Sequence, residues 1–431
     1  MSQIFTASSP GRLDVIGGFA DYSGSLVLQM PITEVTTVSV QPRNDFHCSI
    51  LSELDDHESF LASFSIKELI QSRNLSYQRV RDFFSEKNLT WAAYVAGCAI
   101  LLHRQNKINF TGADFKIKSQ VPLGKGVSSS AALEVSTLKA LALAFNLKFE
   151  GTELPLLAQK VENQIVGAPC GLMDQLTSYY GIANHLLPIT CQPDTLHAPI
   201  SIPQELKFIG VDSGVRHSVS SASYTDVRCA AFMGYSIIAQ WLGITQSEIQ
   251  IAARSGNWKN LPYEGYLCNI TPQEFKNKYQ GLLPDNISGQ EFIKQYHLTT
   301  DSATQVSISK TYSVLSCTKH PILENARVNQ FKQILEKLNQ FGISTEHVTE
   351  LGEFMYQAHG GYTSCGLNSD RTDEIVELAK QAKGIYGARI TGGGSGGTVC
   401  LLAYGEDGLQ SARKIHRTLE EKYKQKLVFF E

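Results

Sequence analysis

The chain lacks the features that mark proteins which bind nucleic acids or span membranes. It has no run of five or more Lys or Arg residues, and its 38 basic and 41 acidic residues give a net charge of −3. Such a chain offers no basic surface to DNA, RNA or an anionic membrane. Its longest apolar stretch, residues 92–102, is about half as long as a bilayer-spanning helix. We therefore expect small molecules as partners, with no nucleic acid and no membrane.

The cysteine pattern excludes a disulfide framework and a zinc site. The nine cysteines are odd in number, widely spaced and free of any C-x-x-C pair, which is typical of reduced thiols. The first residues, MSQIFTASSPGR, lack the basic and apolar segments of a secretion signal. We expect a cytoplasmic protein.

Hydrophobic patterning predicts a mixed α+β chain of two lobes. Neither a repeat nor a low-complexity linker divides the 431 residues, and we place the boundary near residue 205, which gives domains 1–205 and 206–431. In chain order we expect strands at 26–40, 108–121, 207–212 and on both sides of a glycine turn in 387–403, and helices at 89–104, 128–145, 324–342, 370–384 and 407–424.

A glycine-rich loop, PLGKGVSSSA at residues 122–131, stands between a predicted strand and a predicted buried helix. Glycines let backbone N–H groups approach an anion, and the N-terminus of the helix adds partial positive charge. The loop is not a Walker A motif. It indicates either a phosphate cradle or a plain glycine turn with a serine N-cap.

A second glycine segment, GGGSGG at residues 392–397, contains both G-x-G-x-x-G and G-x-S-x-G. A dinucleotide site and a hydrolase elbow both need a helix after the glycines, whereas TVCLL indicates a strand. Asp407 and His416 follow Ser395 in the order of a hydrolase triad, but both fall in a charged amphipathic helix. We expect a turn that lets the backbone pass close to a ligand.

Two further segments carry acidic residues. Glu162 and Asp174 lie on either side of a Gly/Pro turn, so together with a phosphate cradle they are candidates for a metal ligand and a general base. Residues 9–24, SPGRLDVIGGFADYSG, place Arg12 and Asp21 among glycines. Taken singly, Glu162 and Asp174 are more often solvated or capping carboxylates, and the Arg12–Asp21 segment could be a turn with a surface ion pair.

In this order the four segments resemble the motifs of the GHMP kinases and, within them, of the galactokinase group. PGRLDVIGGFADYSG is similar to the sugar-binding motif of that group, PLGKGVSSSA to its ATP loop, GAPCGLMDQ to its catalytic turn and ARITGGGSGGTV to its C-terminal glycine motif. The resemblance implies a two-lobed GHMP kinase fold of class α+β. Its N-terminal lobe would be like ribosomal protein S5 domain 2 and its C-terminal lobe ferredoxin-like.

The resemblance also implies ATP-dependent phosphorylation of the C1 hydroxyl of a sugar. Asp174 would accept the hydroxyl proton, and Arg12 would keep that carboxylate ionised and hold the transferred group. The implied ATP contacts are Gly124, Gly126, Ser128 and Ser129, with Trp91 and Tyr94 near the adenine. The implied Mg²⁺ ligands are Ser130 and Glu162, and the implied sugar contacts are Asp21, Gly171 and Tyr224.

One departure from the family pattern bears on the substrate. Galactokinases have Gly-Glu-His-Thr-Asp-Tyr where this chain has Gly17-Gly18-Phe19-Ala20-Asp21-Tyr22, so the Glu and His that contact galactose near C6 are missing. L-arabinopyranose matches D-galactopyranose at C2 to C4 and lacks C6, and Phe19 would fill the vacated space. Several segments, GGFADYSGSLVLQMPI among them, resemble the kinase domain of plant L-arabinokinases more than ordinary galactokinases.

We therefore expect a kinase that converts L-arabinose to L-arabinose 1-phosphate, with D-galactose as the alternative substrate. A catalytically silent sugar- and ATP-binding regulator is the alternative of another class. The joint presence of Arg12, Ser130, Glu162 and Asp174 favours catalysis. The resemblance implies a monomer or weak homodimer.

Overall fold

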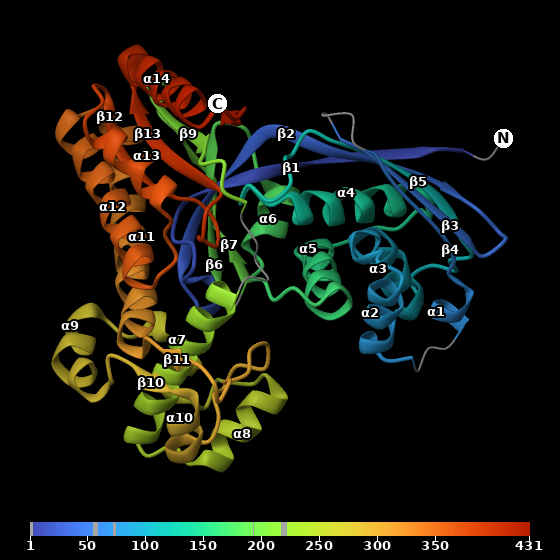
Figure 1. The fold of residues 1–431 in the computed structure, drawn as a ribbon, viewed down its shortest axis with the longest axis horizontal. Helices are drawn as coiled ribbons and strands as arrows, with labels where there is room; N and C mark the ends of the chain where they lie inside the picture. The colour runs from blue at the N-terminus through green and yellow to red at the C-terminus, as the bar shows by residue number, and fades with distance from the viewer. Residues whose placement is uncertain (1–2, 55–58, 72–74, 193, 217–221) are drawn as a thin grey trace. The chain divides into compact units, whose positions relative to one another are not determined.

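The structure of the chain is a computed structural model that describes residues 3–54, 59–71, 75–192, 194–216 and 222–431 (Figure 1). By its contacts the chain forms two compact units, residues 1–12 with 30–183 and residues 13–29 with 184–431. The family-domain boundary near residue 205 stays a prediction, and that residue lies between β8 (Ile200–Ser201) and β9 (Leu206–Asp212). Among the described helices, none combines the length and apolar character needed to cross a bilayer.

The first unit contains a sheet with strand order β4–β3–β5–β2, in which β3 and β5 are parallel and the other neighbours antiparallel. Its strands are β4 (Ser59–Ser65), β3 (His47–Leu54), β5 (Ala113–Ser119) and β2 (Leu26–Pro42), and β1 (Phe5–Ile16) pairs with β2. Its helices are α1 (Lys67–Gln71), α2 (Tyr77–Glu86), α3 (Thr90–Arg104), α4 (Ser129–Ala144), α5 (Glu153–Lys160) and α6 (Met173–Tyr180).

The helices of this unit lie against one face of its sheet (Figure 1). Residues of α3 and α4 such as Ala96 and Leu138 are completely buried in one cluster with Val38, Ile50 and Phe115 of the strands. This burial explains why the sequences of both helices are apolar nearly all round. It also anchors the first turn of α4, which follows the glycine loop.

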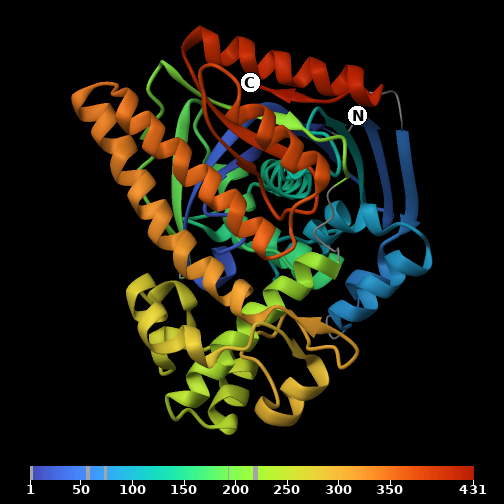
Figure 2. The ribbon, with the colours of Figure 1, turned by 60° about the vertical axis from the view of Figure 1, so that its left-hand side comes forward.

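The second unit contains an antiparallel sheet with strand order β12–β13–β9–β14. Its strands are β12 (Ile385–Ile390), β13 (Thr398–Tyr404), β9 and β14 (Phe429–Phe430). The segment Leu26–Gln29 of β2 pairs with β6 (His185–Cys191), which also pairs with β7 (Asp194–Leu196) and β8. Two long helices, α11 (Val314–Phe341) and α12 (Thr345–Ser364), lie side by side (Figure 2).

The second unit also contains helices and short strands outside this sheet. The helices α13 (Asp370–Lys380) and α14 (Gly405–Tyr423) pack on the β12–β13 strands. The elements between residues 222 and 312 are α7 (Ala222–Trp241), α8 (Gln246–Ser255), α9 (Pro272–Glu274), β10 (Ile287–Ser288), α10 (Gly289–Tyr296) and β11 (Thr311–Tyr312), with a 3-10 turn at Leu267–Asn269.

The predicted helices and strands are confirmed, with shifted boundaries. The strand expected at 108–121 spans only Ala113–Ser119, and the helix expected at 370–384 ends at Lys380. The helix expected from residue 324 begins earlier, at Val314. Pro321 lies inside α11, and an interior proline removes a helical hydrogen bond and normally ends a helix pattern. Here the burial of that turn against the rest of the unit outweighs the local cost.

Candidate functional site

The glycine loop of the first unit adopts the backbone expected of an anion cradle. Gly124, Gly126 and Ser128 all have left-handed conformations, with φ of 69°, 72° and 60°. Left-handed residues at such spacing let successive amides line a concave turn, and α4 starts directly afterwards, at Ser129. The Ser128 Oγ is buried and has no hydrogen-bond partner among the described residues, so it is left for a ligand.

Arg12 joins the glycine loop to Asp174. Its Nε and Nη2 both lie 2.8 Å from Asp174 Oδ1, and its Nη1 donates to the Gly126 carbonyl at 2.7 Å. The Arg12 amide also donates to the Val127 carbonyl at 3.0 Å. The Arg12 side chain is 3% exposed and that of Asp174 20%. The guanidinium is therefore fixed, while the carboxylate stays accessible beside the loop.

A buried acidic cluster surrounds Glu162, which lies in a π-helical turn (Val161–Val166). Its Oε2 accepts hydrogen bonds from Gln175 Nε2 at 2.7 Å and Cys170 Sγ at 3.5 Å, and it also interacts with Ser130. Burial raises the pKa of Glu162 to about 7. Glu134, one helical turn after Ser130, is completely buried beside it, and burial together with the Glu162 charge raises its pKa.

The donor set of Ser130 and Glu162 fits a hard divalent cation. Mg²⁺ prefers oxygen ligands and is held by one or two protein groups together with waters and substrate phosphates. The described residues contain no group of three or more His, Cys, Asp or Glu side chains that could hold a metal by themselves.

Trp91 and Tyr94 lie on α3 in the same unit. The Trp91 ring packs against Phe60, with centroids 5.9 Å apart. Burial raises the pKa of Tyr94, and the charges of Glu162 and Glu134 raise it further. Their expected place near an adenine stays a prediction.

In the second unit, Phe19 lies close to Asp21 and Tyr224, two of the sugar contacts that the resemblance implies. Phe19 is 1% exposed, and its ring meets those of Tyr22, Tyr224 and Tyr362 edge to face at 5.5, 5.0 and 6.0 Å. Asp21 is buried in the turn that follows Phe19. Gly171, the third of these implied sugar contacts, belongs to the first unit, close to Asp174 in the chain.

Gly18 has a reason to be glycine that the sequence does not reveal. A Cβ added there would lie 1.8 Å from Asp14 Oδ2 and 2.8 Å from the Tyr362 hydroxyl. The Asp14 carboxylate is held by Gln29 Nε2 at 2.7 Å and Arg389 Nη1 at 3.0 Å, and both partners of the ion pair are fully buried. The space where a side chain at position 18 would begin is therefore filled by protein.

Asp14 and Arg389 are the pair that sequence reasoning missed. Both stand inside motifs that were recognised, Asp14 between Arg12 and Gly17 and Arg389 before the GGGSGG segment. In the sequence, each of the two is a charged residue within a strongly apolar strand pattern. That pattern does not show which residue is its partner.

The GGGSGG segment does not form a hydrolase site. Asp407 is exposed and pairs with Lys383 at 2.7 Å, and His416 Nε2 donates to the Leu427 carbonyl at 3.2 Å. A strand, β13, follows the glycines. The expected glycine turn is confirmed, because Gly392, Gly394, Ser395, Gly396 and Gly397 all have positive φ.

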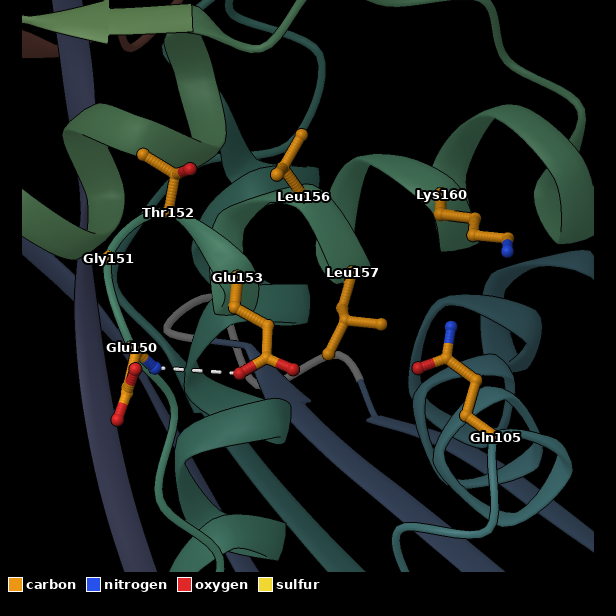
Figure 3. A pocket seen from close by; sticks show the side chains of 8 residues that line it. All are labelled: Gln105, Glu150, Gly151, Thr152, Glu153, Leu156, Leu157 and Lys160. Atoms are coloured by element: carbon orange, nitrogen blue, oxygen red, sulfur yellow. Dashed lines mark hydrogen bonds between the residues drawn. The ribbon is translucent and has the colours of Figure 1, made fainter.

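A surface hollow of about 620 Å³ lies elsewhere in the first unit (Figure 3). It is lined by Gln105, Glu150, Gly151, Thr152, Glu153, Leu156, Leu157 and Lys160. None of the residues that the motifs single out lines it, so it is not the site described above.

Comparison with known proteins matches three family descriptions to this chain. They are GHMP kinases N terminal domain over residues 93–182, GHMP kinases C terminal over residues 321–425 and galactokinase galactose-binding signature over residues 2–42. These ranges include the glycine loop, the Glu162–Asp174 turn, the Gly392–Gly397 turn and the Arg12–Asp21 segment.

Among curated proteins, L-arabinokinase of Arabidopsis thaliana is 39% identical over 98% of this chain, which spans 44% of the plant protein's length. Galactokinase of Chloroflexus aurantiacus is 31% identical, with 92% of this chain and 83% of that protein covered. A structure of Lactococcus lactis galactokinase complexed with galactose superposes with a TM-score of 0.74 at 20% identity, covering 99% and 92% of the two chains. Methanococcus jannaschii mevalonate kinase gives 0.54 at 16% identity, covering 100% and 97%. The expected fold is thereby confirmed.

Proposed function

The chain belongs to the GHMP kinase family and, within it, to the galactokinase group, and on this basis we propose that it transfers the γ-phosphoryl group of ATP to the anomeric hydroxyl of a monosaccharide. The observation that carries the proposal is the contact of the buried Arg12 with both Asp174 and the glycine loop. In this arrangement the candidate base Asp174 and the glycine loop, the candidate anion cradle, both contact the positively charged guanidinium of Arg12.

In this proposal Asp174 accepts the proton of the C1 hydroxyl as the oxygen attacks the γ-phosphorus. Arg12 orients the carboxylate through its contacts with Oδ1 and stabilises charge on the transferred group. Phosphoryl transfer depends mainly on positioning and charge stabilisation, which one base, one buried cation and a rigid loop supply. The phosphates of ATP are cradled by Gly124, Gly126, Ser128 and Ser129, and the adenine lies near Trp91 and Tyr94.

Ser130 and Glu162 would hold Mg²⁺, which supplies neutralisation of phosphate charge. Gln175 and Cys170 orient the Glu162 carboxylate by their hydrogen bonds. Burial raises the pKa of Glu162 to about 7. A cation bound beside it would favour the ionised form of this carboxylate.

As acceptor we propose L-arabinose, bound through Asp21, Gly171 and Tyr224. Support comes from the 39% identity to a protein named L-arabinokinase and from the absence of Glu and His at positions 18 and 19. Phe19 packs among three aromatic rings and presents no charge. The alternative, D-galactose, is supported by the galactokinase relatives.

A silent sugar- and ATP-binding regulator is the competing function. The ion pair between the buried Arg12 and Asp174 argues against it, because a protein that only binds has no need for a buried arginine that orients an accessible carboxylate. We further propose a cytoplasmic monomer or weak homodimer.

The deciding experiment measures ADP release by the purified chain with Mg·ATP and L-arabinose, D-galactose and other pentoses and hexoses. We expect kcat/KM for L-arabinose to exceed that for D-galactose by about 10- to 200-fold, the range for apolar discrimination of one substituent. A preference for D-galactose would overturn the substrate proposal and keep the reaction. No turnover with any sugar would favour the regulator.

A further inference from the structure

The chain between residues 230 and 350 matches none of the four motifs, yet helix α11 within it holds the loop that carries Asp21. We propose that Glu324 and Asn325 of α11 are positioning residues that fix the two ends of residues 17–26, the sugar loop, in the conformation that binds sugar. The proposal rests on the proposed function, which assigns this loop to the sugar. All of its contacts lie within the second unit.

Glu324 holds the first end of the sugar loop. The Gly17 amide donates to Glu324 Oε1 at 3.1 Å, and the carboxylate is fully buried and paired with Arg327. Gly17 has a φ of 104°, a conformation that favours glycine. One helical turn earlier, His320 Nε2 lies 3.5 Å from the Gly18 carbonyl. The loop therefore leaves its strand through a turn whose amide is satisfied by α11.

Asn325 holds the second end. Its Oδ1 accepts from the Leu26 amide at 3.0 Å, and its Nδ2 donates to the Cys268 carbonyl at 3.0 Å. Cys268 Sγ lies 3.8 Å from the Ala20 carbonyl in the middle of the loop and 3.4 Å from the Pro321 carbonyl of α11. One side chain thus ties the end of the loop to a segment that also supports its centre.

Two consecutive helical residues can reach both ends because successive side chains point about 100° apart around a helix. The helix itself is held firmly, since α11 packs along α12 and α7 (Figures 1 and 2). A loop ordered before the sugar arrives avoids the entropy cost of ordering on binding. The clamp should therefore act on sugar affinity rather than on ATP affinity or on the chemical step.

The test compares Asn325→Ala and Asn325→Asp with the control Asn339→Ala. Asn325 is only half-buried, so its variants are expected to fold. Asn339 lies on the same helix and its Nδ2 also donates to one backbone carbonyl, that of Ser201 at 2.7 Å, away from the loop. Each protein is assayed for sugar KM, ATP KM and kcat. Hydrogen exchange is measured on a peptide that contains residues 17–26.

For Asn325→Ala we expect sugar KM to rise about tenfold, with ATP KM and kcat within about twofold, and exchange in the loop to quicken about tenfold. Asn325→Asp keeps an acceptor for the Leu26 amide but loses the donor to the Cys268 carbonyl, so its sugar KM should lie between those of the wild type and Asn325→Ala. Unchanged sugar KM in Asn325→Ala, or an equal effect of Asn339→Ala, would overturn the proposal.

The exchange measurement separates this inference from the proposed function. If the wild type phosphorylates no sugar, the proposed function fails, and the clamp is then judged by exchange alone. Faster exchange of the loop in Asn325→Ala supports it, and exchange equal to that of the wild type overturns it.

Discussion

The Arg12–Asp174 ion pair shows how a carboxylate can be oriented without being enclosed. Arg12 donates hydrogen bonds to Asp174 and to the Gly126 carbonyl. Its position is therefore set by the backbone of the glycine loop. Asp174 is held on one side and open on the other. This is the geometry that a general base needs when its proton donor arrives with the substrate.

Asp174→Asn tests the assignment of the base. The amide has the same size but cannot take up the hydroxyl proton, so we expect kcat to fall by about 10² to 10⁴, with sugar binding retained in calorimetry. The control is Asp407→Asn, which alters an exposed aspartate paired with Lys383 and should leave kcat unchanged. A kcat within twofold of the wild type in Asp174→Asn would remove this residue from the chemistry.

Gly18 illustrates a residue whose identity is decided by a buried neighbour. Since the Asp14 carboxylate lies where its Cβ would stand, any side chain at position 18 must displace the Asp14–Arg389 pair. Restoring the glutamate found in galactokinases would therefore test folding before it tested sugar specificity.

Gly18→Ala is expected to lower the free energy of unfolding by about 3 kcal/mol, because displacing one partner of a buried ion pair leaves a buried charge poorly compensated. Urea denaturation followed by circular dichroism measures the loss. The matched control is Gly360→Ala in α12, where a Cβ meets nothing within 4 Å and where alanine should stabilise the helix by up to about 1 kcal/mol. Equal stabilities of the two variants would contradict this account.

At the scale of elements, α4 and α11 contribute to the proposed site in different ways, α4 through its first turn and α11 through side chains in its middle. The first turn of α4 places Ser129 and Ser130 next to the glycine loop, and the buried Ala131 and Ala132 anchor that turn in the core. Helix α11 instead uses side chains in its middle, His320, Glu324 and Asn325, to hold the loop that carries Asp21.

His320 gives α11 a testable pH dependence. Burial lowers its pKa from 6.5 to about 4, against the opposing influence of Glu324, while Arg327 and Arg389 also disfavour the proton. Between pH 6.5 and about 4, His320 is therefore protonated in the unfolded chain and neutral in the folded chain. The resulting stability is fully present above pH 6.5 and is lost progressively as the pH falls towards 4. At pH 4.5 the loss amounts to about 2 to 3 kcal/mol.

Denaturation of the wild type and of His320→Gln at pH 7 and pH 4.5 checks this expectation. Glutamine does not titrate, so between these pH values the wild type should lose about 2 to 3 kcal/mol more than the variant. Parallel losses in the two proteins would show that His320 is not the group responsible.

Sequence patterns identified α3, α4, α13 and α14 because each keeps one periodicity over its length. The start of α11 was missed, since Pro321 interrupts the pattern and residues 314–323 become helical only where the surrounding unit buries them. Gly18 was noticed as a departure from the family, but its steric cause depends on Asp14, four residues away on a strand, and on Tyr362 of α12.

At the scale of the whole molecule, the division into units does not follow the chain. Residues 13–29 belong to the second unit, although 1–12 before them and 30–183 after them belong to the first. No composition change marks these crossings, because β1 and β2 run through them as continuous strands. The proposed base and phosphate residues lie in the first unit, and Asp21 and Tyr224 lie in the second.

By itself, the sequence determined the family, the α+β class, the glycine loop and the candidate residues, because these depend on short segments whose spacing is local. The tertiary structure alone decided which buried groups are paired. It placed Arg389 on Asp14, Gln175 on Glu162 and Asn325 on Leu26, each across a separation of at least thirteen residues. A buried charge or amide must find a partner, but only the packing of distant elements determines which one it finds.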